Sequence, residues 1–281
     1  MSATRAAVSV RDALDGAVTA IAAAGVRSAR LDAELLLADA MQTTRERLYS
    51  EPLAPVRGEA VRAFRSHVRR RAAGREPVAY ILGRRNFRRL ELHVDARVLV
   101  PRPESELLVE LALAELALGA SVLDCCCGGG ALALALADER ADLRVSGSDV
   151  DAAALAVAAA NAERLGLAVA WQRADLLAGL DDEYDAIVAN PPYVASAAIA
   201  ALAPEIARHE PRLALDGGPD GLDVLARLIE QAARTSVTTL ILEHGEGQHD
   251  AVARRARAAG FPQVTHHRDL AQIVRALVAR R

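Results

Sequence analysis

Apolar residues recur every three to four positions through the first part of the chain, as they do on one face of a helix. Three segments follow this pattern: residues 8–26, 31–41 and 55–73. The last of them is strongly basic, and Gly74 follows it. None of the three alternates with a period of two. We therefore predict a small helical domain over residues 1–84.

A different pattern follows this domain. Residues 86–100 alternate between apolar and polar side chains on either side of a turn near Asp95. This alternation predicts a β-hairpin, which would form a linker over residues 85–101. We expect a helix to follow, from Glu104 to about Leu118.

Short β-rich segments and helical segments alternate along the rest of the chain. Strands are expected at residues 121–125, 143–148, 168–173, 185–189 and 238–243. Alternation of this kind implies a parallel sheet covered by helices on both faces. The second domain, residues 102–281, is therefore of the α/β class, with helices at 131–137 and 152–165. Two later apolar runs, residues 264–267 and 273–278, would close one edge of the sheet as a hairpin.

Composition restricts the class of protein. Hydrophobic residues make up 52% of the 281 residues, enough for a sizeable core. The net charge of −3 argues against a surface that binds nucleic acid throughout. No run of about 20 uncharged apolar residues indicates a membrane span, and the N-terminus carries no secretion signal. We expect a cytoplasmic monomer that binds neither membrane nor nucleic acid directly.

The three cysteines of the chain are consecutive, from Cys125 to Cys127. Neighbours in sequence cannot form a disulfide framework, and no further cysteine could complete a zinc site. We expect no metal, and we interpret the cysteines as small buried apolar residues rather than as redox groups.

The segment after the first expected strand of the sheet has the composition of a ligand-binding loop. It runs from Asp124 through the cysteines to Gly128, Gly129 and Gly130, and a helix follows. Small residues let a ligand approach the backbone, and a helix N-terminus offers free N–H groups. A glycine-rich turn can also serve packing alone, so this loop is a weak signal by itself.

An acidic residue strengthens the signal. The second expected strand ends at Asp149, whose carboxylate could accept hydrogen bonds from ribose hydroxyls or cap the next helix. Loop and acid together favour a nucleoside cofactor. Loop and acid do not by themselves separate dinucleotides from S-adenosylmethionine. The contiguous glycines differ from the Gly-x-Gly-x-x-Gly pattern of dinucleotide sites, which argues against a dehydrogenase.

The strand at 185–189 runs directly into Asn190-Pro191-Pro192-Tyr193. In an open parallel sheet, ligands bind beyond the carboxyl ends of the strands, which places this tetrapeptide beside the loop. The prolines fix the path of the chain and leave carbonyls as free acceptors. If the Asn190 side-chain oxygen and the Pro191 carbonyl accept both hydrogens of an NH2 group, the nitrogen can face a sulfonium methyl group. Tyr193 would pack against the substrate side chain. The alternative is a rigid strand-exit turn.

With these motifs, the chain resembles the protein-glutamine N5-methyltransferases, which methylate the glutamine of the Gly-Gly-Gln loop in class-one peptide chain release factors. The segments that carry the resemblance are residues 31–37, 77–83 and 98–106, the loop at Asp124, Asn190 to Tyr193, His209-Glu210-Pro211 and residues 218–222.

The resemblance implies a Rossmann-like class I methyltransferase sheet that binds S-adenosylmethionine, preceded by a helical domain that recognises the release factor. The residues implied at the methionine and ribose part of the cofactor are Cys126, Cys127, Gly128, Gly129 and Gly130. Asp149 would hold the ribose, and Asp175 with Leu176 would lie beside the adenine. Asn190 would touch the cofactor and, with Pro191, Pro192 and Tyr193, hold the substrate glutamine. The residues implied as a lid or support beside the methionine carboxylate are Arg102, Glu104 and Glu106.

The chain departs from the family at Cys126, where the usual Asp-x-Gly-x-Gly-x-Gly loop has its first glycine. This cysteine and His209-Glu210-Pro211 also resemble the branch that methylates a glutamine of a large-subunit ribosomal protein. The N-terminal domain and the Arg-Pro-Glu-Ser-Glu run resemble the release-factor branch, which we favour.

Two other functions remain open. The same tetrapeptide could orient an amino group of a nucleic-acid base. The arginines that could then contact phosphate, or simply form a solvated surface, are Arg69, Arg70, Arg71, Arg75, Arg84, Arg85, Arg88 and Arg89. A non-enzymatic binding module is the other alternative. In that case Asn190→Ala would leave the function intact, whereas we expect loss of methyl transfer.

Overall fold

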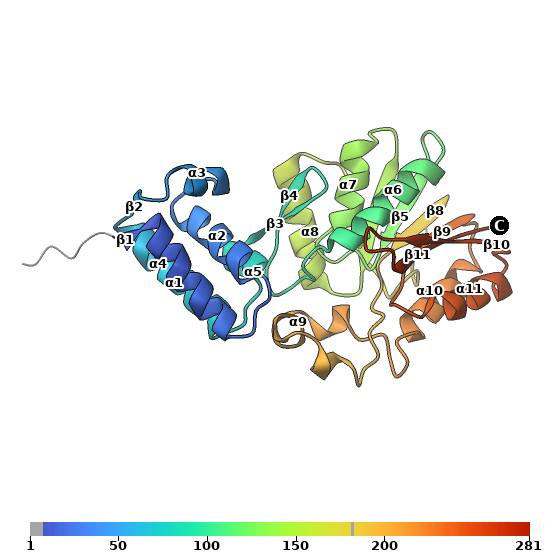
Figure 1. The fold of residues 1–281 in the computed structure, drawn as a ribbon. Helices are drawn as coiled ribbons and strands as arrows, with labels where there is room; N and C mark the ends of the chain where they lie inside the picture. Colours follow the sequence, from blue (N-terminus) through green and yellow to red (C-terminus); the bar gives the residue numbers. More distant parts are fainter. Residues whose placement is uncertain (1–7, 181–182) are drawn as a thin grey trace, which may run out of the picture. The chain divides into compact units, whose positions relative to one another are not determined.

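The computed structural model describes residues 8–180 and 183–281. The chain divides into two compact units (Figure 1). The first unit contains the chain up to Gly83 together with residues 203–209, and the second contains residues 84–202 and 210–281. The segment 203–209 therefore packs with the N-terminal helices, although it lies far along the sequence.

The first unit is helical, as predicted. Its helices are α1 (Val10–Ala23), α2 (Ala29–Ala40), α3 (Arg45–Ser50), α4 (Glu59–Ala72), α5 (Val78–Leu82) and α9 (Pro204–His209). Their apolar faces form one core that includes Leu14, Ile21, Leu36 and Phe64. The sequence analysis missed α3 and α5, which are too short to show a period. It also missed the two-residue pair of β1 (Val8–Ser9) and β2 (Pro55–Val56).

A buried ionic network joins α9 to α4. Arg71, whose side chain is 6% exposed, donates hydrogen bonds to Asp32 (2.6 Å) and to Glu205 (2.7 Å). Arg75 donates to both oxygens of Glu205. Since a buried guanidinium must be paired to remain stable, Glu205 holds α9 within the first unit.

The second unit is built on a seven-stranded sheet of order β10-β11-β9-β8-β5-β6-β7. The strands are β5 (Ser121–Cys125), β6 (Arg144–Asp149), β7 (Ala170–Arg173), β8 (Ala186–Ala189), β9 (Thr239–Glu243), β10 (Gln263–Arg268) and β11 (Val274–Arg280). All five strands expected for the parallel part are present and pair in parallel. The antiparallel hairpin of β10 and β11 closes one edge, as predicted.

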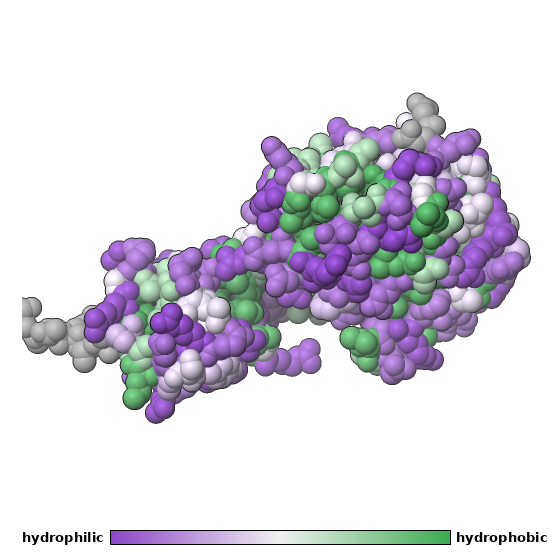
Figure 2. All heavy atoms as spheres, turned by 90° about the horizontal axis from the view of Figure 1, so that it is seen from above, coloured by the Kyte–Doolittle hydropathy of each residue, from purple (hydrophilic) through white to green (hydrophobic). Residues whose placement is uncertain are grey.

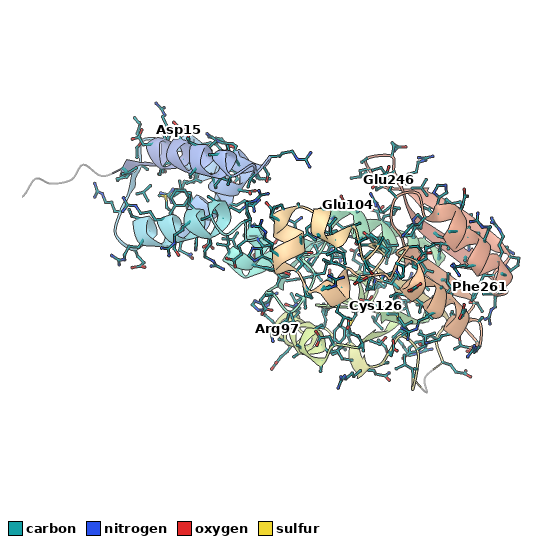
Figure 3. All side chains as sticks on the ribbon, turned by 90° about the horizontal axis from the view of Figure 1, so that it is seen from below. Asp15, Arg97, Glu104, Cys126, Glu246 and Phe261 are labelled. Carbon is teal, nitrogen blue, oxygen red and sulfur yellow. The ribbon has the colours of Figure 1, made fainter. Side chains whose placement is uncertain are left out.

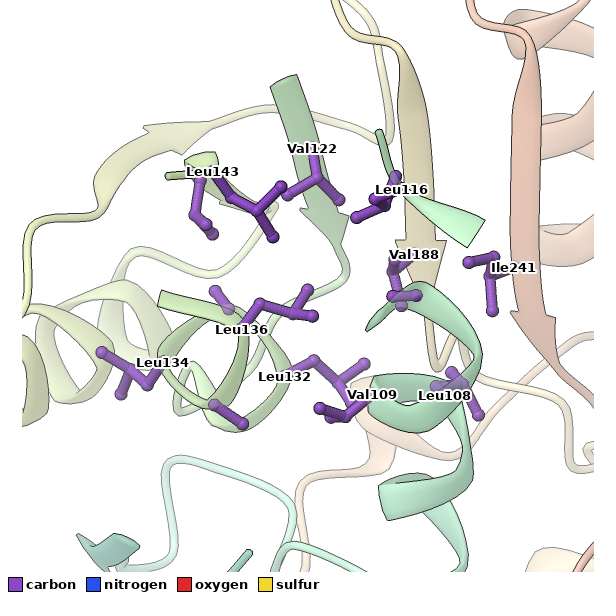
Figure 4. Close-up of a cluster of buried hydrophobic side chains, with 14 of the residues drawn as sticks. Leu108, Val109, Leu116, Val122, Leu132, Leu134, Leu136, Leu143, Val188 and Ile241 are labelled. Carbon is purple, nitrogen blue, oxygen red and sulfur yellow. The ribbon is translucent and has the colours of Figure 1, made fainter. Parts of the chain in front are cut away.

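Helices cover both faces of this sheet (Figure 1). They are α6 (Glu106–Glu115), α7 (Ala131–Glu139), α8 (Ala152–Leu165), α10 (Asp223–Ala232) and α11 (His249–Ala258), with 3-10 turns at Pro103–Ser105, Ile199–Ala201 and Arg212–Ala214. Successive strand residues point to opposite faces. Val122 and Val188 therefore pack against α6 and α7 (Figure 4), whereas Leu123 and Ile187 belong to the cluster that contains α10 and α11.

The linker hairpin lies earlier than the sequence analysis placed it. Its strands are β3 (Arg84–Phe87) and β4 (Leu90–His93), so the chain reverses at residues 88–89. The predicted second arm, at residues 98–100, is not a strand. Val98 and Val100 are nevertheless buried, and burial of alternate side chains in an extended segment produces the same pattern as a strand.

The face drawn in Figure 2 carries hydrophobic residues interspersed with hydrophilic ones. The large apolar side chains that are exposed are far apart in sequence, such as Leu53, Leu118 and Leu270. Within residues 8–180 and 183–281, none of the helices is both long and apolar enough to cross a membrane.

Candidate active site

A cavity of about 190 Å³ lies at the carboxyl ends of the parallel strands in the second unit. The loops that follow β5, β6, β7 and β8 line it, together with residues 97–105 and 211–216. The predicted site residues in its lining are Arg102, Cys126, Cys127, Gly128, Gly129, Asp149, Asp175, Leu176, Asn190 and Pro192. The predicted residues outside the lining are Glu104, Glu106, Gly130, Pro191 and Tyr193.

The loop after β5 makes a tight turn that depends on left-handed backbone conformations. Cys126, Gly128 and Gly130 all have positive φ, of 63°, 53° and 84°. Gly130 must be a glycine, because a Cβ there would lie 2.7 Å from the Trp171 ring. Gly130 therefore allows the loop to pack on Trp171, while Cys126, in the interior of the second unit (Figure 3), faces the cavity.

Asp149 is the acid at the end of β6, and it is not the cap of the next helix. Asp151 caps α8, since its side chain accepts a hydrogen bond from the Ala153 N–H (2.8 Å). Asp149 instead accepts from the N–H groups of Gly128 and Asp151, each at 2.9 Å, and burial raises its pKa. Each carboxylate oxygen keeps a second acceptor site, so Asp149 can also bind hydroxyl groups in the cavity.

Asp124 is a functional candidate for which the sequence analysis proposed no role. Its side chain is fully buried, and Oδ2 accepts a hydrogen bond from the Ala133 N–H (3.0 Å). Oδ1 is also buried and has no hydrogen-bond partner among the described residues. Burial raises the pKa of Asp124 to about 8. A cation in the cavity would offset the cost of this carboxylate.

These features fit S-adenosylmethionine. The small-residue loop leaves backbone accessible, Asp149 and Asp175 offer acceptors for hydroxyl and amino groups, and Asp124 suits a ligand with positive charge. No three His, Cys, Asp or Glu side chains of the described residues are grouped so that they could hold a metal ion.

Asn190 follows β8 and lines the cavity, and its side chain is part of a hydrogen-bonded chain. Its Nδ2 donates to Ser105 Oγ (2.9 Å), which donates to Glu243 Oε2 (2.6 Å). The Tyr193 hydroxyl donates to the other oxygen, Glu243 Oε1 (3.0 Å). The pKa of Tyr193 is raised by burial and by the Glu243 charge. Tyr193 therefore directs its hydroxyl to Glu243, and its packing against a substrate stays a prediction.

The sequence analysis named neither Ser105 nor Glu243 as a site residue. Glu243 is the last residue of β9, which lies next to β8. A charged residue at the end of an apolar strand could have indicated a site residue in the sequence. In the Arg-Pro-Glu-Ser-Glu run, Ser105 is the residue beside Asn190. Glu104 is exposed, and Glu106 accepts a hydrogen bond from the Arg88 N–H.

The Asn190–Tyr193 backbone is held from outside by a second segment. Gln248 Nε2 donates to the Tyr193 carbonyl (3.0 Å). Gly221 has a φ of 78°, and a Cβ there would overlap the same carbonyl oxygen. The Gly218–Leu222 motif thus lets two stretches of backbone touch, which fixes the tetrapeptide.

Arg102 lines the cavity and pairs with Glu210 at 2.6 Å. The Glu210 side chain is 1% exposed, and burial raises its pKa despite this partner. The ion pair therefore joins the Arg-Pro-Glu-Ser-Glu run to the His209-Glu210-Pro211 motif at the cavity wall.

The fold and the site define an S-adenosylmethionine-dependent class I methyltransferase. The hMettl16 catalytic domain in complex with an RNA hairpin shares the fold with a TM-score of 0.57 and 17% identity, over 79% of this chain and 81% of that chain. A methyltransferase from Pyrococcus furiosus gives a TM-score of 0.51 and 18% identity, over 68% and 88%.

Sequence relatives define the family more narrowly. Residues 12–83 match the PrmC N-terminal domain, and residues 103–219 match the methyltransferase small domain. The release factor glutamine methyltransferase of Moorella thermoacetica is 43% identical over 90% of this chain and 91% of its own length. That of Cereibacter sphaeroides is 42% identical over 92% and 94%. The chain belongs to the release factor glutamine methyltransferase family, which confirms the resemblance stated above.

Proposed function

We propose that this enzyme methylates the side-chain amide nitrogen of the Gly-Gly-Gln glutamine in class-one peptide chain release factors. The relatives are named for release factor glutamine methylation, and they match nearly the whole chain. The observation that carries the proposal is the position of Asn190, which lines the cavity with its NH2 group bound to Ser105. Such an enzyme would act in the cytoplasm, and we propose a monomer.

The Asn190 side-chain oxygen is suited to bind the substrate amide. It accepts no hydrogen bond from the described residues, and neither does the Pro191 carbonyl. Two acceptors are what an NH2 group needs, since it has two hydrogens to donate. Binding both would hold the planar amide in one orientation and favour the positive charge that develops on nitrogen.

S-adenosylmethionine supplies a methyl group bound to a positively charged sulfur. With this cofactor bound, the bond from the glutamine nitrogen to the methyl carbon would replace the carbon–sulfur bond, whose electron pair would stay on sulfur, and the nitrogen would release one proton to water. The role of the chain is to hold the nitrogen in line with that carbon. Pro191, Pro192 and the clamp formed by Gly221 and Gln248 give the rigidity this requires.

The arginines at the domain junction do not favour a nucleic-acid substrate. Within the first unit, Arg70 pairs with Glu76 and Arg71 with Asp32 and Glu205. In the second unit the pairs are Arg88 with Glu139 and Arg89 with Asp138. Arginines neutralised within the chain are poor ligands for phosphate.

Asn190→Ala tests the proposed site. We expect methyl transfer to purified release factor to fall about 100-fold, because one oriented acceptor is lost, while the affinity for S-adenosylhomocysteine stays unchanged. Asn86→Ala, on the exposed side of β3, is the matched control and should transfer normally. Ribosomal protein and plain oligonucleotides are assayed in parallel. Methylation of these alone, or full activity of Asn190→Ala, would contradict the proposal.

A further inference from the structure

Behind Asn190 lies a buried polar chain that the proposed function does not require by itself. Glu243 is 1% exposed and Ser105 is 4% exposed. Both oxygens of Glu243 accept hydrogen bonds, one from Tyr193 and one from Ser105. The Ser105–Glu243 distance of 2.6 Å is typical of a hydroxyl that donates to a charged carboxylate.

The carboxylate fixes the direction of every hydrogen bond in this chain. An ionised Glu243 has no proton, so both of its oxygens can only accept. The Ser105 hydroxyl has one hydrogen to donate, and it donates this hydrogen bond to Glu243. The Ser105 oxygen can then only accept a hydrogen bond from Asn190, which must turn its NH2 group toward Ser105. The Asn190 oxygen, on the other side of the amide plane, then remains free to accept a hydrogen bond from a ligand in the cavity.

This direction matters because the two branches of an amide have nearly the same shape. An Asn190 rotated by half a turn would fit the same space and would present NH2 to the substrate. Two NH2 groups would then face each other, and the substrate amide would lose an acceptor. Shape alone cannot prevent the rotation, whereas a serine that can only accept does prevent it.

We propose that Ser105 and Glu243 are positioning residues that hold Asn190 with its oxygen toward the substrate amide. The inference rests on the proposed role of Asn190. It assigns to Glu243 a function beyond structural support: the carboxylate determines whether the site binds a donor or an acceptor.

Glu243→Gln and Ser105→Ala test this assignment. In Glu243→Gln, the introduced amide can present its own NH2 group to Ser105, which then donates to the Asn190 oxygen and favours the rotated amide. Ser105→Ala removes the acceptor that holds the NH2 group. For both variants we expect kcat to fall about 10- to 100-fold, with unchanged affinity for S-adenosylhomocysteine. Ser105→Thr keeps the hydroxyl and should retain activity.

The preference for glutamine over glutamate separates orientation from general damage. A release factor with glutamate in place of the methylated glutamine offers acceptors only, so the wild-type site should reject it as a competitive inhibitor. A rotated Asn190 offers a donor and should accept it. We expect the ratio of the KM for the glutamine release factor to the inhibition constant of the glutamate release factor to rise at least about tenfold in Glu243→Gln. Damage to packing would weaken both ligands equally.

Ser121→Ala is the matched control, since Ser121 is a buried serine at the opposite end of β5 whose hydroxyl donates to the Glu183 carbonyl. It should leave both kcat and the ratio unchanged. The inference is overturned if Ser105→Ala and Glu243→Gln keep wild-type kcat and ratio while Asn190→Ala is inactive. Full activity of Asn190→Ala would overturn the proposed function itself. If Glu243→Gln fails to fold, Ser105→Ala is the test: a ratio of KM to inhibition constant equal to that of the wild type would overturn the inference.

Discussion

Replacing Asp124 by asparagine should stabilise the free enzyme and weaken its binding of S-adenosylmethionine. Asp124 is fully buried, and one of its oxygens has no partner among the described residues. Asparagine has nearly the same shape and can still accept the hydrogen bond from Ala133. The substitution therefore removes the titratable carboxyl group with little change in packing.

The size of the effect follows from the pKa. Burial raises the pKa of Asp124 from 3.8 to about 8. The folded state binds the Asp124 proton more tightly than the unfolded state does. The free energy of unfolding is therefore unaffected by this group below about pH 4 and falls as the pH rises from about 4 to about 8. At pH 7 the loss is about 4 kcal/mol. The asparagine NH2 group would itself lack a partner, at a cost of about 1–3 kcal/mol. The net gain at pH 7 is therefore about 1–3 kcal/mol and disappears near pH 5.

Trp171 provides the assay. It is the only tryptophan of the chain and lies against Gly130 in the loop and Gly147 in β6, so its fluorescence reports unfolding of the second unit. Urea titrations of wild type and Asp124→Asn at pH 5, 7 and 8.5 give the free energies of unfolding. Calorimetry with S-adenosylmethionine gives the affinity, which we expect to fall because asparagine cannot ionise beside a positively charged ligand as the Asp124 carboxyl can. A variant that is less stable than wild type at pH 8.5 would refute the reasoning.

Two further predictions concern other parts of the chain. Among the described residues, Glu205→Ala leaves Arg71 with one acidic partner, Asp32, besides the Glu76 carbonyl, and should destabilise the first unit by about 3 kcal/mol, measured by circular dichroism in urea. The exposed pair of Arg62 and Glu59 is the control, since Arg62→Ala should cost less than about 0.5 kcal/mol. Gly221→Ala should lower kcat at least about tenfold, because the new Cβ overlaps the Tyr193 carbonyl. Gly247→Ala has the same positive φ in open space, so equal kcat losses in the two variants would contradict the clamp.

Much of the second unit could be predicted because its signals are local. Strands β5, β8 and β9 are short, largely apolar and buried runs, and α8 is a long periodic segment whose predicted bounds, 152–165, are those observed. The loop after β5 and the Asn190–Tyr193 turn were found because both follow a strand directly. The carboxyl ends of parallel strands meet at one edge, so neighbouring loops in space could be inferred from sequence order.

The rest depends on contacts that sequence order does not reveal. Ser105 and Glu243 are separated by 138 positions. The pairing of β9 with β8 brings Glu243 near Asn190, and Ser105 reaches both from the 3-10 turn before α6. The hairpin was misplaced because Val98 and Val100 alternate in burial without pairing as a strand. Helix α9 belongs to the first unit through Glu205, whose partners lie more than 100 positions earlier.

The membership of α9 has a consequence for dissecting this protein. The chain passes from one unit to the other after Gly83, after Leu202 and after His209, so no single cut separates two complete halves. A fragment ending at Gly83 would lack the acid that neutralises Arg71 and Arg75, and the complementary fragment would carry α9 without its binding surface. A deletion of either half would therefore leave an incomplete unit. A chimera that exchanges the N-terminal region between two relatives must also exchange residues 203–209.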